Sequence, residues 1–239
     1  PAGALGIDAA GGSLALETLS GTLSVSAAVR VIGTAHVLMS TEGAAADLMV
    51  AASVTTEGGN VSLLAGRDLV IGSTGSVDTQ GGTIDLDARG RFLRLLRGAR
   101  LTSDGGGIRM ASQDDALLSG VDAGAGGISV TSRAGRILGN GTRVLALEGR
   151  QVRLNGAAGV GVLTGGLLRI AAERVAAFSA QGDVGLISGG AIEVGQVSLT
   201  VGRVQPDGRI TALLDGALNG IATGGNGSVV LLTENGAIQ

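Results

Sequence analysis

Glycine pairs that recur every 20 to 24 residues, each followed by short apolar patches, constrain the fold of this chain more than any other feature. The segment GGNVSLLAGRDLVIGSTGSVDTQGG, residues 58–82, holds three such patches between two glycine pairs. In four successive units, the first apolar residues after the glycine start are 23, 24 and 20 positions apart: Val61, Ile84, Ile108 and Ile128. A repeated period of this length is the signature of a repeat architecture.

Each patch is three to five residues long and alternates apolar with polar or small residues, which is the period of a half-buried strand. Gly, Ser, Asn and Asp cluster between the patches, where turns with positive φ are expected. Strands this short do not form a stable sheet alone, and the spacers are too short for crossover helices. We therefore expect a parallel β-helix of about ten turns, in which each turn adds one short strand to each of three sheets.

The same spacing extends along the chain, so we treat residues 1–239 as a single β-helix repeat domain, a segment of a larger protein. Before residue 58, patches at 37–39, 48–50 and 54–55 fill the three strand positions of one turn. Further strands are expected at roughly eight-residue spacing, at Ile137, Val144, Val152, Val160, Leu168, Val175, Val184 and Ile192. An all-β sandwich also has short strands at such spacing, but it requires neither glycine pairs nor matched strand trios.

The composition separates this chain from several classes of protein. Its 45 glycines would suit a disordered chain, but 44% of its residues are hydrophobic, which indicates a folded chain with many tight turns. A net charge of −3 and only two aromatic residues, Phe92 and Phe178, argue against nucleic-acid binding. Cysteine is absent, and uncharged stretches such as residues 154–168 are too short and glycine-rich to span a bilayer.

Three segments of the chain carry a family resemblance: residues 58–82, GGTIDLDARG at 81–90 and GGISVTSRAGRILGNG at 126–141. They resemble the repeat region of filamentous-haemagglutinin-type adhesins, closely over residues 54–154 and loosely over 11–239. The resemblance implies a right-handed parallel β-helix that belongs to a large bacterial exoprotein. It also implies two-partner secretion, and therefore an outer-membrane secretion partner.

A pair of carboxylates at Asp85 and Asp87 is the one arrangement that suggests catalysis. Alternation would turn Ile84 and Leu86 inward and both carboxylates outward, about 6.5 Å apart by Cα, within reach of a two-carboxylate glycan-cleaving mechanism. However, the chain has no Tyr, Trp or Lys to support a sugar. We favour instead an exposed cross-strand ion pair between Asp85 and Arg109, its counterpart on the next turn, worth under ~1 kcal/mol.

Two further motifs lack part of the chemistry that they suggest. His36 is the only histidine, and the sequence assigns it neither a nucleophile nor an orienting acid, so we expect a surface or strand-edge residue. The segment GGNGSVVLL, residues 224–232, resembles a calcium-binding nonapeptide, but Val229 stands where the ligating Asp belongs, so we expect no calcium there. No cofactor or metal site is expected elsewhere.

Asn-x-Ser/Thr triplets occur at Asn60, Asn140 and Asn226. Such triplets are glycosylated only where the modifying enzyme exists, and chance matches are common in a chain rich in Gly, Ser and Thr. We expect unmodified asparagines, with Asn60 and Asn140 in turns.

The segment ARGRFLRLLRGAR, residues 88–100, is the densest charge cluster, with arginine at every third position: Arg91, Arg94, Arg97 and Arg100. It could form a short helix with a cationic stripe that contacts anionic glycans or lipopolysaccharide. It also aligns with the preceding turn if one residue is inserted, which favours a solvated bulge on the rod.

We expect a non-catalytic structural or adhesive rod of an exported bacterial surface or biofilm-matrix protein, located at the cell surface or secreted. Its partners would be glycans or proteins of host or neighbouring cells. Two alternatives remain: a self-assembling filament or matrix subunit, and a polysaccharide-active β-helix enzyme that uses Asp85 and Asp87. Neither end of the sequence resembles a polar cap, so we expect the rod to continue in its parent protein or to join end to end with copies of itself.

Overall fold

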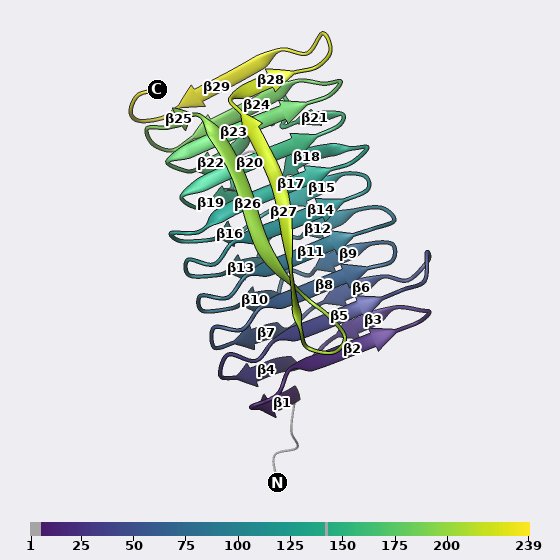
Figure 1. The fold of residues 1–239 in the computed structure, drawn as a ribbon. Helices are drawn as coiled ribbons and strands as arrows, with labels where there is room; N and C mark the ends of the chain where they lie inside the picture. Colours follow the sequence, from purple (N-terminus) through teal and green to yellow (C-terminus); the bar gives the residue numbers. More distant parts are fainter. Residues whose placement is uncertain (1–5, 142) are drawn as a thin grey trace.

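The computed structural model describes residues 6–141 and 143–239, and in it the chain is an all-β solenoid of about eight turns (Figure 1). Each turn has about 23 residues and three strands, and its strands pair in parallel with those of the turns above and below. No helix occurs in this part of the chain. The parallel β-helix expected from the glycine pairs is therefore confirmed, with fewer turns than the ten expected.

One sheet runs the length of the rod, and we call it the covered sheet because a hairpin lies over it. Its strands are β2 (Leu14–Thr18), β5 (Val37–Thr41), β8 (Val61–Ala65), β11 (Ile84–Ala88), β14 (Ile108–Ser112), β17 (Gly127–Ser132), β20 (Gln151–Gly156) and β23 (Arg174–Ser179). Two short strands, β25 (Glu193–Val194) and β28 (Ile221–Thr223), pair side by side with β23 and complete it.

The other two strands of each turn form two columns, named here after a central strand of each. The β12 column contains β3 (Leu23–Val25), β6 (Leu48–Val50), β9 (Leu69–Ile71), β12 (Leu93–Leu95), β15 (Ala116–Leu118), β18 (Arg136–Gly139) and β21 (Gly159–Val160). The β13 column contains β1 (Gly6–Ala10), β4 (Ala28–Ile32), β7 (Ser53–Thr56), β10 (Ser76–Asp78), β13 (Arg100–Thr102), β16 (Val121–Asp122), β19 (Leu147–Glu148) and β22 (Leu168–Ala171). The columns merge at β24 (Val184–Ser188), which also pairs with β29 (Val229–Thr233).

The interior is a set of aliphatic ladders that follow the rod axis. Val61 is in register with Ile84, Ile84 with Ile108, and Ile108 with Ile128, and all four side chains are fully buried. The inward positions expected from the glycine spacing are therefore confirmed. Each aliphatic side chain buried in this way stabilises the fold by about 1.5–3 kcal/mol relative to its exposed state.

The glycine pairs are required by the turn that precedes each strand of the covered sheet. Gly81 has φ +110°, which side chains rarely adopt, whereas a Cβ on Gly82 would lie only 2.1 Å from the carbonyl oxygen of Gly59 on the turn below. The Thr79 hydroxyl donates to the Gly82 carbonyl at 2.6 Å and closes this turn. One glycine thus provides the φ angle and the other the close stacking.

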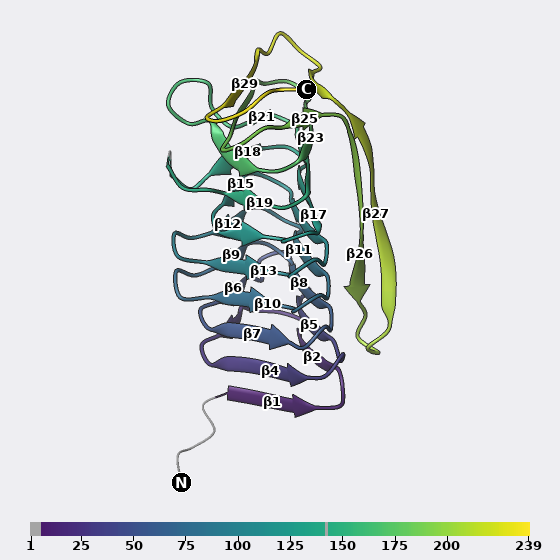
Figure 2. The same cartoon turned by 90° about the vertical axis from the view of Figure 1, so that its left-hand side faces the viewer.

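A hairpin interrupts the last strand of the covered sheet. Val194 is in register with Val175 and Ile221 with Ala177, so residues 195–220 leave the sheet in the middle of a strand position. They form β26 (Gln196–Val204) and β27 (Ile210–Asn219), which pair antiparallel and extend back along the rod over the covered sheet (Figures 1 and 2). This excursion uses a stretch that would otherwise make a further turn, which is one reason why ten turns were too many.

One expected strand is misplaced. Val144 lies between strands, and its expected position belongs to Leu147, which is in register with Val121 below and Ile170 above. A longer connection after β18 moves the strand three residues along the chain. The alternation of apolar residues around 144–147 did not distinguish the two positions.

Candidate functional site

The outer face of the covered sheet carries a polar ladder. One outward residue from each of five consecutive strands, β8, β11, β14, β17 and β20, is in register with the next: Ser62, Asp85, Arg109, Ser129 and Arg153. Because side chains alternate along a strand, these residues turn away from the aliphatic interior and toward the hairpin. The hairpin supplies two charged partners for the ladder, Arg203 from β26 and Asp215 from β27.

Every carboxylate oxygen of Asp85 and Asp87 has an arginine partner. Asp85 accepts from Arg109 Nη1 at 2.9 Å and from Arg203 Nε at 2.6 Å. Asp87 accepts from Arg133 Nη2 at 3.0 Å and from Arg203 Nη2 at 3.0 Å. The predicted pair between Asp85 and Arg109 is confirmed, but its predicted exposure is wrong, since the hairpin leaves Asp85 0% exposed. A glycan could reach these carboxylates only after the hairpin had moved.

A second group of contacts lies further along the ladder, around Asp215. Its carboxylate accepts from Arg109 Nε at 3.0 Å and from the Ser129 hydroxyl at 2.6 Å, and Arg153 Nε donates to the Gly216 carbonyl at 2.7 Å. Burial opposes the charge of Arg109, but the carboxylates of Asp85 and Asp215 outweigh burial and raise its pKa. Burial lowers the pKa of Arg153, which has no carboxylate within ion-pair distance in the described part of the chain.

Apolar contacts accompany the ion pairs beneath the hairpin. Val197, Leu199 and Val201 are 1%, 9% and 2% exposed, and they alternate with exposed Ser198 and Thr200 along β26. Near the tip, Val204 packs against the outward side chains of two covered strands, Leu38 and Leu64. The hairpin therefore has a buried apolar side of its own. Both hydrophobic burial and the ion pairs with the polar ladder hold it against the covered sheet.

The arginine cluster lies on another side of the rod, and no helix forms there. Arg91, Arg94, Arg97 and Arg100 are all exposed, on the strands and turns around β12 and β13. Ala65 is in register with Ala88 but Leu69 with Leu93, so the predicted one-residue insertion is confirmed. The guanidinium groups of Arg91 and Arg94 each lie 4.5 Å from the Phe92 ring centroid. None of the four arginines pairs with a carboxylate of the described residues.

His36 belongs to a ladder of side chains that bind the backbone of the next turn. The Ser13 hydroxyl accepts from the His36 amide at 3.1 Å, His36 Nδ1 accepts from the Asn60 amide at 3.0 Å, and Asn60 Oδ1 accepts from the Thr83 amide at 2.8 Å. Burial lowers the pKa of His36. The ring is thus placed at a strand edge, as expected, where it acts as a neutral hydrogen-bond acceptor.

The remaining motifs lie in turns. Asn140 donates from its amide Nδ2 to the Leu95 carbonyl at 3.0 Å, although Thr142, which completes its triplet, lies outside the described residues. Asn226 lies in an exposed turn before β29, and Val229 beyond it is 46% exposed. Within residues 6–141 and 143–239, no group of three or more His, Cys, Asp or Glu side chains could hold a metal ion.

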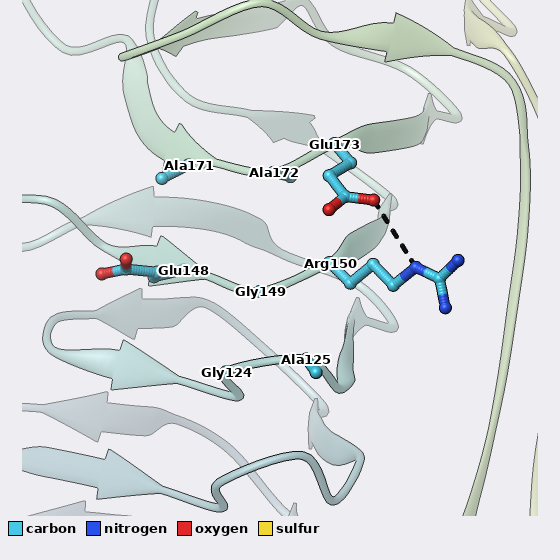
Figure 3. A pocket seen from close by; sticks show the side chains of 8 residues that line it. All are labelled: Gly124, Ala125, Glu148, Gly149, Arg150, Ala171, Ala172 and Glu173. Atoms are coloured by element: carbon cyan, nitrogen blue, oxygen red, sulfur yellow. Dashed lines mark ion pairs between the residues drawn. The ribbon is translucent and has the colours of Figure 1, made fainter.

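An open hollow of about 700 Å³ lies on three successive turns at the edge of the covered sheet (Figure 3). Its floor is formed by small residues: Gly124, Ala125, Gly149, Ala171 and Ala172. Glu148, Arg150 and Glu173 surround it, and Arg150 Nε lies 3.5 Å from Glu173 Oε2, with both side chains more than two-thirds exposed. An exposed pair of this kind contributes little to binding or stability.

No family model, curated protein or solved structure matches this chain. No helix in the described part of the chain is long and apolar enough to cross a membrane.

Proposed function

We propose that this chain is a non-catalytic structural or adhesive rod of an exported bacterial surface or extracellular-matrix protein. The observation that carries the proposal is the stacking of the turns, in register and without a break, from β2 to β23. Such a stack extends in one direction and presents long faces rather than an enclosed pocket. The arginine cluster on one of these faces is a candidate for contact with anionic glycans.

The ion pairs between the covered sheet and the hairpin support a structural role for the buried carboxylates. Asp85, Asp87 and Asp215 all bind arginine, and two of those arginines, Arg109 and Arg203, bridge two carboxylates each. In this arrangement the carboxylates hold the hairpin against the covered sheet. A general acid needs instead a carboxyl group that can reach the substrate.

The proposal is tested with beads coated with the purified chain. We expect them to adhere to bacterial or host cell surfaces, and beads coated with an unfolded Ile84→Asp variant to adhere less. In parallel, the chain is incubated with a panel of acidic polysaccharides. New reducing ends from the wild type, absent with an Asp85→Asn/Asp87→Asn variant that still folds, would replace the proposal with the polysaccharide-active enzyme.

A self-assembling filament is the second candidate, because the last turn presents an open strand edge. β29 pairs with β24 on one side, and along the rest of the described chain it has no second partner. Val229 and Leu232 on this strand are 46% and 47% exposed. Such an edge can template further strand pairing. Sedimentation velocity over a wide concentration range separates the candidates: growth into polymers supports the filament, and a constant monomer supports the isolated rod.

A further inference from the structure

The outward side chains of the β12 column are apolar on four of five consecutive turns. One residue from each of β6, β9, β12, β15 and β18 points away from the interior and is in register with the next: Met49, Val70, Arg94, Leu117 and Leu138. Met49 is 45% exposed and the other apolar members are half-buried. Figure 2 shows these strands on the opposite side of the rod from the hairpin.

The β13 column provides an internal comparison. Its outward residues are also in register over five turns, and all of them are polar: Thr55, Asp78, Thr102, Asp122 and Glu148. Polar outward residues are expected where a sheet faces water. The two columns belong to the same turns, so the apolar outward side chains are a property of one face and not of the repeat.

Exposed leucines continue this apolar face around the corner between the two columns. Leu96 follows β12 and is 38% exposed, and Leu145 lies in the connection between β18 and β19 and is 39% exposed. Each has an exposed arginine close by in the chain, Arg97 and Arg143 respectively. We call the outward residues of the β12 column, these two leucines and the arginine cluster the leucine–arginine face.

The positive charges of this face are available to a ligand. Stacking on Phe92 holds Arg91 and Arg94 in place, which reduces the conformational entropy that they lose on binding. Three acidic residues directly precede strands of the β12 column, Asp47, Asp68 and Asp115, and each carboxylate accepts a hydrogen bond from the next turn, that of Asp115 from the Arg136 amide. Asp47 binds Arg67 and the Asp68 amide, and Asp68 accepts from the Phe92 amide.

We propose that the leucine–arginine face binds a lipid surface that carries anionic phosphate head groups, with the rod lying along that surface. Guanidinium groups form bidentate bonds with phosphate at head-group depth, while leucines enter the boundary with the acyl chains. A soluble polyanion would use the arginines and leave the leucines in water, whereas an apolar peptide would not require the arginines. The proposal extends beyond the rod function, because a rod that binds only glycans has no need of the exposed leucines.

Vesicle co-sedimentation tests the proposal with the full chain. We expect binding to phosphatidylcholine vesicles that contain phosphatidylglycerol, weaker binding as salt is added, and none to phosphatidylcholine alone. Arg94→Ser and Arg97→Ser should each weaken binding about fivefold, since a basic residue near such a surface contributes about 1 kcal/mol. The Leu96→Ser/Leu145→Ser variant keeps every charge and should weaken binding about tenfold.

Matched controls come from the hairpin, on the opposite side of the rod. Leu214 is 70% exposed and the Arg209 side chain 86% exposed, so Leu214→Ser and Arg209→Ser make the same chemical changes away from the face and should bind as the wild type does. All the substituted side chains are exposed, so the thermal melts of the variants are expected to match that of the wild type.

If the leucine variant binds anionic vesicles like the wild type, the proposal is overturned and the face is a polyanion site. The same conclusion follows if dextran sulfate, a soluble polyanion, binds both proteins equally and the vesicles bind neither.

Discussion

Arg203 lies between Asp85 and Asp87, with Nε 2.6 Å from Asp85 Oδ2 and Nη2 3.0 Å from Asp87 Oδ2, although Arg203 and Asp85 are 118 positions apart in the chain. The turns of a solenoid contact mainly their neighbours. The hairpin departs from this pattern because it reaches back over several turns and binds side chains on each. It thereby links several turns of the covered sheet along the rod axis. We call these contacts the hairpin tie.

Replacing Arg203 should loosen this tie. Arg203→Ala leaves Asp85 without one of its two partners in a buried site, and breaking a buried ion pair costs about 3 kcal/mol or more. Chemical denaturation followed by circular dichroism measures the loss. Arg209→Ala, at the exposed tip of the same hairpin, should change stability by no more than ~0.5 kcal/mol. Equal losses of stability in the two variants would show that Arg203 does not stabilise the docked hairpin.

The glycine pairs should tolerate no side chain at the stacked position. In Gly82→Ala, the new Cβ would lie 2.1 Å from the Gly59 carbonyl oxygen, so the turns must separate, at a cost of several kcal/mol. Gly190→Ala is the control, because no atom lies within 4 Å of its added Cβ. The melting temperature of Gly82→Ala should therefore be well below that of Gly190→Ala. Similar melting temperatures would show that the turns are not stacked as described.

Because Ile84 belongs to the interior ladder, the stability of the fold should depend strongly on the side chain at this position. Ile84→Asp places an unpaired charge between Val61 and Ile108 and should cost several kcal/mol or prevent folding. Ile84→Val removes one methylene and should cost about 1 kcal/mol. Denaturation midpoints of the purified variants test this order. An aspartate variant as stable as the valine variant would mean that position 84 faces solvent.

The His36 ladder predicts a loss of stability in mild acid. Because burial lowers the pKa of His36 in the folded state, the unfolded chain takes up the proton first as pH falls below about 6.5. Stability is therefore present above that pH and declines below it. Thermal melts from about pH 7 to about pH 5 should fall less steeply for His36→Gln, which keeps an acceptor for the Asn60 amide. Parallel curves for the two proteins would contradict this role.

The titration of Glu42 and Asp47 should remain separate from that of His36. Hydrogen bonds from Ser40 and Arg67 lower the pKa values of Glu42 and Asp47, respectively. The stability that these groups contribute is lost only as pH falls below about 4.5, the ordinary range of a carboxyl group. The difference between wild type and His36→Gln is therefore read above that range.

The aliphatic ladders were predictable because they depend on spacing within one repeat. Val61, Ile84 and Ile108 occupy the same place after each glycine start, and counting from that start also places Asp85 beside Arg109. The burial of Asp85 was not predictable in this way. It depends on Arg203, which lies 118 positions after Asp85 in the chain.

The hairpin nevertheless has a local signal in the sequence. Pro206, Asp207 and Gly208 separate two apolar stretches, a common turn pattern, and Gly208 has φ +78°. In β26, Val197, Leu199 and Val201 alternate with polar residues over more positions than any short solenoid strand would use. The spacing of the glycine pairs indicates neither the turn nor the long strand, because the hairpin does not follow that spacing.

Amide hydrogen exchange at Gly202 and Val204 tests the docked hairpin most directly. The Gly202 amide donates to Thr83 Oγ1 at 3.0 Å and the Val204 amide to Ser62 Oγ at 2.9 Å. Ser62 lies in β8 and Thr83 directly precedes β11, so neither acceptor belongs to the hairpin. These two amides should exchange as slowly as those of the covered strands in the wild type, and much faster in Arg203→Ala. Exchange in the wild type at the rate of an exposed, unstructured segment would show that the hairpin does not rest on the rod.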